Sequence, residues 1–296
     1  MTADGSSPVV RRRRLAATLR RLRADSGKTL EDVAEYLEFS ATKISRIETG
    51  QVGVRVHDVR GLLDCYGVDG QQRDELLELV RLSRTKAWWH AYSDLLSEDV
   101  QTFIGLEDEA AQVHSYETHH VPGLLQTEGY ARALMTARPD TPLEDVERGV
   151  ALRLKRQAIL ARSHPPQLHA ILDQAALHRR AGSTEVMLAQ LRHLIQEAAK
   201  PHITLQVLPL SAAAHPGDGF AFTILSFTNP ADPKIAYTET LLAEYSTDNP
   251  ELVGRCRSEF DYLLARALSP AGTTDFIEGL ISALAAGQLP LPAAAS

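Results

Sequence analysis

The chain has 296 residues, of which 44% are hydrophobic, and a formal net charge of −7 at pH 7. This composition excludes a disordered chain, and the absence of a long apolar run excludes a membrane-spanning protein. Two cysteines are too few for a disulfide framework or a cysteine-rich zinc site. We therefore expect a soluble, reduced, cytoplasmic protein of one large or two ordinary domains, without a cofactor or a metal.

The charge is unevenly distributed along the chain. Residues 1–86 contain 16 lysines and arginines against 13 acidic residues, whereas residues 87–296 contain 15 against 25. The first part therefore carries a net charge of +3 and the second −10. A locally basic part attracts nucleic acid because phosphate neutralisation releases counterions.

After a flexible lead over residues 1–8, an arginine run at 11–14 opens a first helix, which closes at 25–27. Its buried stripe consists of three leucines: Leu15, Leu19 and Leu22. Taken alone, the arginine run is typical of a solvated helix face. Arg20, Arg21 and Arg23 extend this basic face.

Residues 29–50 contain two short helical patterns separated by a tight turn. Thr29 and Asp32 form a near capping box, and apolar residues follow at helical spacing through Leu37. Ser40 is placed to cap a second helix that ends at Gly50. The buried face of this second helix consists of Ile44 and Ile47. The pattern predicts a helix-turn-helix.

Residues 11–70 resemble the helix-turn-helix domain of the Cro/cI-like (xenobiotic-response-element) regulators. The resemblance rests on five groups of residues: Lys28–Leu30, Val33–Ala34, Ser40, Lys43–Glu48 and Gly50. It implies that double-stranded DNA is a partner and that residues 41–49 form the recognition helix. Beside such a motif, we expect some of the arginines at 11–14 to meet phosphates or a minor groove.

The recognition helix supplies the candidate base contacts. We expect Thr42 and Arg46 to reach base edges, with Arg46 facing guanine. Ala41 is placed for a thymine methyl, and Ser45 for a base or a phosphate. The candidate backbone contacts are Lys43, Arg20 and Arg55. The predicted DNA-binding set is completed by four further residues: Ser40, Thr29, Arg12 and Arg13. Glu48 is assigned a structural role because phosphate would repel its carboxylate.

Two further helices, near 56–66 and 71–83, complete an all-α five-helix domain over residues 1–86. The remaining residues, 87–296, form a second domain. Three aromatic residues follow the boundary: Trp88, Trp89 and Tyr92. They either pack the two domains together, which we favour, or form the wall of a ligand or partner pocket.

The second domain has mixed patterns, which predict an α+β fold. Helices are expected at 100–118, 127–137, 142–161, 184–199, 250–268 and 270–286. Strands are expected at 168–172, 203–208, 220–227 and 234–237, with a further strand at 241–245. The short loops between the later strands favour a mostly antiparallel sheet.

The second domain resembles the large C-terminal domain of actinobacterial antitoxin-like transcriptional regulators. The resemblance rests on four segments: Val121–Gln126, Tyr130–Ala133, Val207–Pro209 and His215–Gly217. It implies binding of a small companion protein whose gene lies nearby. The segments suggest organisation rather than chemistry, because none of them is a catalytic motif.

No phosphate loop, nucleophile elbow or His-Glu-x-x-His motif is present, so we do not expect an enzyme. We expect a homodimeric, nucleoid-associated transcriptional regulator that reads an inverted-repeat operator, with the second domain for dimerisation and partner binding. One alternative is a regulator whose second domain binds a small-molecule effector. Another is an enzyme with autoregulatory DNA binding.

Overall fold

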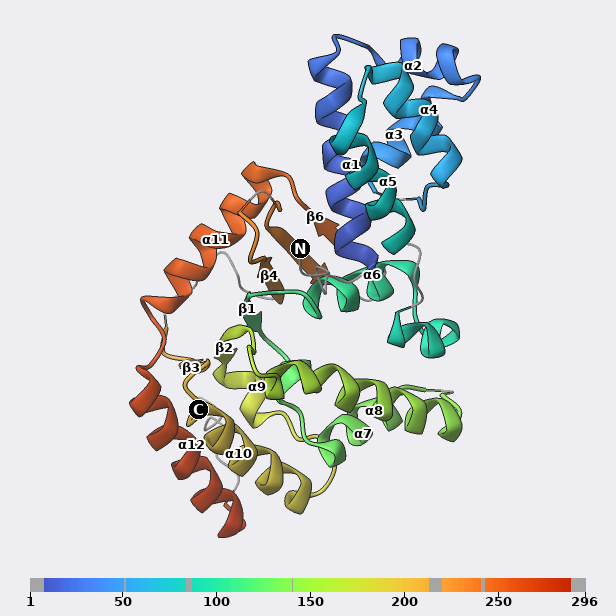
Figure 1. The fold of residues 1–296 in the computed structure, drawn as a ribbon. Coiled ribbons are helices and arrows are strands. Elements are labelled where there is room, and N and C mark those ends of the chain that lie inside the picture. Colours follow the sequence, from blue (N-terminus) through green and yellow to red (C-terminus); the bar gives the residue numbers. More distant parts are fainter. Residues whose placement is uncertain are drawn as a thin grey trace. The chain divides into compact units, whose positions relative to one another are not determined.

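The computed structural model describes residues 8–50, 52–83, 87–139, 141–212, 220–230, 232–240 and 243–288. The chain divides into two compact units, residues 1–90 and 91–296. Among the described residues, the first unit contains helices alone, and the second combines helices with one sheet (Figure 1). The predicted fold class, a helical helix-turn-helix domain followed by an α+β domain, is confirmed.

The described part of the first unit contains five α-helices: α1 (Pro8–Asp25), α2 (Leu30–Leu37), α3 (Ala41–Glu48), α4 (Val56–Tyr66) and α5 (Gly70–Leu82). They enclose one apolar core that includes Leu15, Leu19, Val33, Ile44, Leu62 and Val80. The predicted leucine stripe of α1 is only partly buried at Leu22, which packs against the edge of this core.

Local hydrogen bonds define the ends of α2 and α3. The Asp32 carboxylate accepts a bond from the Thr29 amide at 2.8 Å, and the Thr29 hydroxyl accepts one from the Asp32 amide at 3.1 Å. The Ser40 hydroxyl accepts a bond from the Lys43 amide at 3.1 Å. Gly50 has φ +70°, and a Cβ there would lie 3.5 Å from Ala16 Cβ. The predicted capping box, N-cap and glycine terminus are confirmed.

The second unit contains a sheet and the helices that cover it. Its strands are β1 (Gln112–Glu117), β2 (Gln167–Asp173), β3 (Ile203–Leu208), β4 (Phe222–Ser226), β5 (Ile235–Glu239) and β6 (Glu244–Thr247). Its α-helices are α6 (Glu98–Glu107), α7 (Glu128–Thr136), α8 (Leu143–Gln157), α9 (Gln174–His178), α10 (Thr184–Ala198), α11 (Pro250–Leu264) and α12 (Pro270–Ala285). Three 3₁₀ helices complete it: η1 (Trp88–Leu95), η2 (Gly123–Leu125) and η3 (Ala158–Ala161).

The strand order is β3-β2-β1-β4-β5-β6. β1, β2 and β3 run parallel, whereas the β1–β4, β4–β5 and β5–β6 pairs are antiparallel. The parallel strands are joined by helical crossovers, as parallel connections require. The sheet is mixed and mostly antiparallel, in agreement with the prediction.

Two details of the predicted second domain are wrong. Residues 112–117 form a central strand, β1, and not the end of a helix over 100–118. The strand expected at 241–245 is β6 at 244–247, and residues 241–242 lie outside the described residues, as does the predicted segment His215–Gly217.

Strand register divides the side chains of the sheet between two faces. Ser115 pairs with Thr223, and Thr223 pairs with Tyr237, so these three residues share a face. Phe103 of α6 stacks on Tyr237 with ring centroids 3.9 Å apart, which covers that face. On the other face, His114 meets Phe260 of α11 edge to face at 5.0 Å. Figure 1 shows α11 on one side of the sheet and α7 and α8 on the other.

His114 should make the second unit sensitive to acid. Burial, with Arg257 and His169 beside the ring, lowers its pKa to about 4; Asp261 and Lys234 are the other charged groups that act on it. Below pH 6.5 the imidazole of His114 binds a proton in the unfolded chain but not in the folded chain. The free energy of unfolding therefore falls as the pH drops towards 4. Because water partly screens this half-buried ring, we expect His114→Gln to remove only about 1–2 kcal/mol of this loss. Denaturant unfolding at pH 7 and at pH 4.5 checks this, and an unchanged pH slope in the variant would contradict it.

Candidate nucleic-acid interface

One face of α3 is fixed to the rest of the first unit. Ile44 is fully buried and Ile47 is 3% exposed. At the end of the helix, Glu48 is 4% exposed and accepts a bidentate pair of bonds from Arg23 of α1, at 2.8 and 2.9 Å. The Tyr66 hydroxyl donates to the same carboxylate at 3.3 Å. The structural role predicted for Glu48 is that of a buried link between α1, α3 and α4.

The opposite face of α3 is polar and accessible. Ser40, Thr42 and Arg46 are exposed, and Ala41 and Ser45 are half-buried. Arg46 lies in the last turn of α3, where the described residues offer it no ion pair. An exposed guanidinium beside short polar side chains matches the donor pattern that reads guanine in a major groove.

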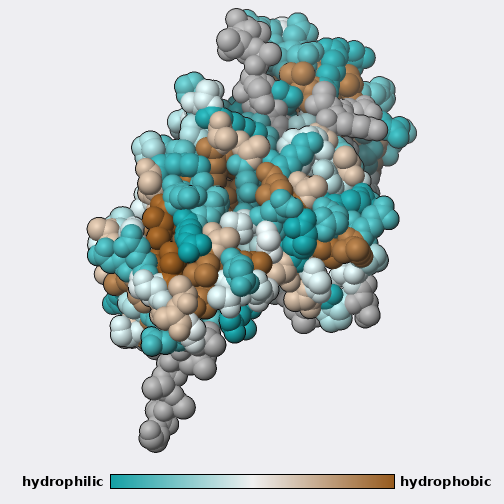
Figure 2. All heavy atoms as spheres, turned by 90° about the horizontal axis from the view of Figure 1, so that it is seen from below, coloured by the Kyte–Doolittle hydropathy of each residue, from teal (hydrophilic) through white to brown (hydrophobic). Residues whose placement is uncertain are grey.

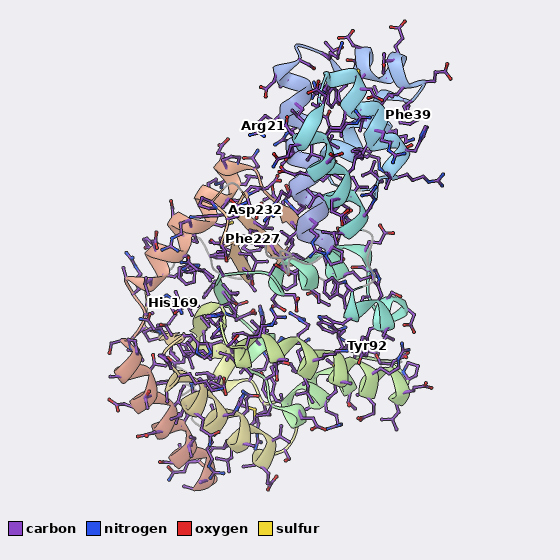
Figure 3. All side chains as sticks on the ribbon, in the orientation of Figure 1. Arg21, Phe39, Tyr92, His169, Phe227 and Asp232 are labelled. Carbon is purple, nitrogen blue, oxygen red and sulfur yellow. The ribbon has the colours of Figure 1, made fainter. Side chains whose placement is uncertain are left out.

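Lys43 is less free than the other predicted contacts. Its Nζ lies 3.4 Å from the Asp58 carboxylate and 3.2 Å from the centroid of the Phe39 ring. Figure 3 shows Phe39 at the turn between α2 and α3. A contact between Lys43 and a phosphate would therefore compete with an existing ion pair and a cation–π contact.

The arginines of α1 have different environments. Arg20 and Arg21 are exposed, as Figure 3 shows for Arg21. Arg12 and Arg13 are half-buried, and Nη1 of Arg11 donates to the carbonyl oxygen of Leu82 at 3.4 Å. The expectation that Arg23 extends the basic face is wrong, because its guanidinium pairs with Glu48. The two remaining predicted contacts, Thr29 and Arg55, are exposed at the starts of α2 and α4.

Comparison with family models gives two matches. Residues 14–76 match a helix-turn-helix domain, which supports a DNA-binding regulator. Residues 100–279, more than half of the chain, match a domain of unknown function, DUF5753. The chain belongs to the DUF5753 family. Comparison with curated proteins and with solved structures gives no match.

Just before the DUF5753 match, η1 carries the three aromatic residues that were candidates for a ligand wall. Trp89 is 2% exposed, and its ring meets that of Trp88 edge to face at 5.5 Å. Tyr92 is half-buried and lies on the same 3₁₀ helix (Figure 3). Burial of Trp89 is typical of a packing residue, so its ring offers little surface to a ligand.

No helix within the described ranges is long and apolar enough to cross a membrane. In the same part of the chain, no three histidine, cysteine, aspartate or glutamate side chains are grouped to hold a metal ion. Figure 2 shows patches of hydrophobic residues among hydrophilic ones on one face of the molecule. The DUF5753 domain does contain one charged cluster that the sequence did not reveal, formed around Glu117 and Arg153.

Proposed function

We propose that the chain is a sequence-specific transcriptional regulator that places α3 in a DNA major groove. The observation that carries the proposal is the division of α3 into a buried face and an exposed polar face that bears Thr42 and Arg46. Phosphate contacts from Arg20 and Arg55 would position the helix, and base contacts would select the sequence.

Arg46→Ala tests the role of α3. We expect the variant to bind its operator about 10–100-fold more weakly, which is the effect of losing one good bidentate base contact. The measurement has two steps. Genomic DNA that co-purifies with the wild-type chain is sequenced to find the site, and the affinity for that site is then measured at fixed salt.

The matched control is Arg81→Ala. Arg81 is an exposed arginine on α5, where it pairs with Glu78. α5 packs against α1 and α4 and is not the proposed recognition helix, so we expect the control to bind as the wild type does. Equal affinities of the Arg46 variant and the wild type, or the absence of an enriched site, would contradict the proposal.

We propose further that the regulator is a homodimer that reads an inverted repeat, because one such domain buries little DNA surface. The DUF5753 domain would hold the dimer and bind a small companion protein in an antitoxin-like role. This makes the protein cytoplasmic, nucleoid-associated and non-enzymatic. An effector-binding role of the DUF5753 domain is the second candidate, and the charged cluster around Arg153 favours it. An enzyme with autoregulatory DNA binding is the third.

A further inference from the structure

Two carboxylates lie at the C-terminal ends of two strands that run in the same direction. Glu117 is the last residue of β1 and Glu239 the last of β5. β4 lies between these strands and is antiparallel to both, so β1 and β5 run in the same direction. The register aligns Ser115 with Tyr237, and the next residues on that face are Glu117 and Glu239. Both carboxylates therefore lie on the same face of the sheet, where β1 and β5 end.

Arg153 of α8 lies close enough to Glu117 and Glu239 for both carboxylates to interact electrostatically with its guanidinium. Within the described residues, its one hydrogen bond goes from Nη1 to Gln126 Oε1 at 3.0 Å, and it forms no ion pair. The next arginine of the helix differs: Arg156 is held by Glu107 through bonds of 2.8 and 3.0 Å. Of the two arginines, Arg153 is the one whose charge is not matched by a carboxylate in contact.

The loop before α7 holds Arg153 in a fixed place. A Cβ at Gly123 would lie 2.7 Å from Nη1 of Arg153, so any larger residue at this position would have to displace the guanidinium. Gln157 donates to the carbonyl oxygens of Gly123 and Gln126, at 2.9 and 2.7 Å. The side-chain amide of Gln126 donates to the Val121 carbonyl at 2.7 Å. These bonds preorganise the loop and the arginine together.

Glu117 and Glu239 likewise have no positively charged side chain in contact among the described residues. In the described part of the chain, Glu117 has one hydrogen bond, from the Ser115 hydroxyl at 3.1 Å, and Glu239 has one, from the Tyr237 hydroxyl at 3.4 Å. Burial raises the pKa of Glu117 to about 7 and lowers that of Arg153 to about 10. The titratable groups that face Glu117 are Arg153 and Arg156 from α8, Glu239 from β5 and Tyr130 from α7.

We propose that Arg153, Glu117 and Glu239 form a binding site for a small polar ligand that carries both an oxyanion and a hydrogen-bond donor. The guanidinium takes the oxyanion, since its remaining N–H groups suit a planar or tetrahedral anion. The two carboxylates accept bonds from an ammonium or hydroxyl group of the same ligand. A simple anion would satisfy Arg153 and leave two carboxylates facing it. This site goes beyond DNA binding and does not depend on it.

Three probes of similar size separate the parts of this site: acetate, glycolate and glycine. All three carry a carboxylate, glycolate adds a hydroxyl and glycine adds an ammonium. Each is titrated into the full chain at constant ionic strength and pH 8, and the Arg153 side-chain NH signal is followed by NMR. We expect all three to bind, and either glycolate or glycine to bind about 10-fold tighter than acetate, as one added charge-assisted hydrogen bond predicts. The tighter of the two identifies the donor.

The pH dependence of probe binding is a measurement that a purely structural role of Glu117 would not change. Because burial raises the pKa of Glu117 to about 7, this carboxylate loses charge between pH 8 and pH 6, so the advantage of the donor-bearing probe should shrink as the pH falls over this range. The variant Glu117→Gln should reduce that advantage and remove its pH dependence. Acetate binding should remain in this variant, because Arg153 is intact.

Two variants test the arginine. Arg153→Gln should abolish binding of all three probes, observed through the backbone amides of residues 123–126. If this variant does not fold, Gly123→Ala displaces the guanidinium and should weaken binding about 10-fold. Arg148→Gln, on the same helix and paired with Asp94, is the control and should bind as the wild type does. Absence of binding by all three probes, wild-type affinity in the Arg153 or Gly123 variant, or equal affinity for the three probes would overturn the proposal.

Discussion

Replacing Glu48 by alanine is expected to reduce the free energy of unfolding of the first unit by about 3–5 kcal/mol, because a buried charge loses its partner. The Arg23 side chain is 18% exposed, and Glu48 supplies two of the oxygens that its guanidinium contacts; the other is the Lys28 carbonyl oxygen, at 2.9 Å. The bonds to Glu48 raise the pKa of Arg23. Without them the guanidinium is still too basic to lose its proton, so it stays charged when the carboxylate is removed. The Tyr66 hydroxyl loses its acceptor in the same substitution.

Amide hydrogen exchange on the full chain measures this effect, because it reports the two units separately. We expect exchange of the most protected amides of α1, α3 and α4 to accelerate by about 10²-fold or more, while the sheet is unaffected. Asp64→Asn is the control: it breaks the Arg73–Asp64 pair, in which the aspartate is 52% exposed, and should change little. A double substitution, Arg23→Met with Glu48→Leu, should restore most of the stability. Equal effects of the Glu48 and Asp64 variants would contradict the assignment.

Elements set by local hydrogen bonds could be predicted from the sequence. The caps at Thr29 and Ser40 depend on hydrogen bonds between residues three apart, so the local sequence is enough to predict them. The link between Arg23 and Glu48 could not be predicted in this way. It joins two helices whose packing follows from the core, and in sequence Arg23 is one basic residue among several.

The second unit shows where sequence patterns fail. β1 reads Gln-Val-His-Ser-Tyr-Glu, and both faces of this central strand are covered, so its polar residues hide the usual alternation. Without β1, the parallel half of the sheet could not be predicted. The cluster of Glu117, Arg153 and Glu239 depends on that same strand, because the alignment of β1 with β5 brings its members together.

Substitution of Glu107 by glutamine is expected to destabilise the second unit by about 3–5 kcal/mol. Glu107 is 4% exposed and ends α6, where it holds the Arg156 guanidinium, whose side chain is 13% exposed. Arg156 also lies over the Phe103 ring, 5.6 Å from its centroid, and Phe103 stacks on Tyr237 of the sheet. Loss of the carboxylate leaves Arg156 without the carboxylate that contacts it and close to Arg153, whose pKa it already lowers. Two neighbouring guanidinium charges in a poorly solvated place repel each other, so the cost exceeds that of a surface pair.

The same exchange experiment distinguishes this buried pair from exposed ones. In Glu107→Gln, the protected amides of β1, β4 and β5 should exchange about 10²-fold faster or more, while α1–α5 keep their wild-type rates. Asp94→Asn breaks the pair with Arg148, in which the aspartate is 62% exposed, and we expect little change. A second substitution, Arg156→Met, should recover part of the loss in the Glu107→Gln background, since it removes the charge left without a partner. If that second substitution lowers stability further, then the contacts of the Arg156 stem on Phe103, and not the buried charge, dominate the energetics of this link between α6, α8 and the sheet.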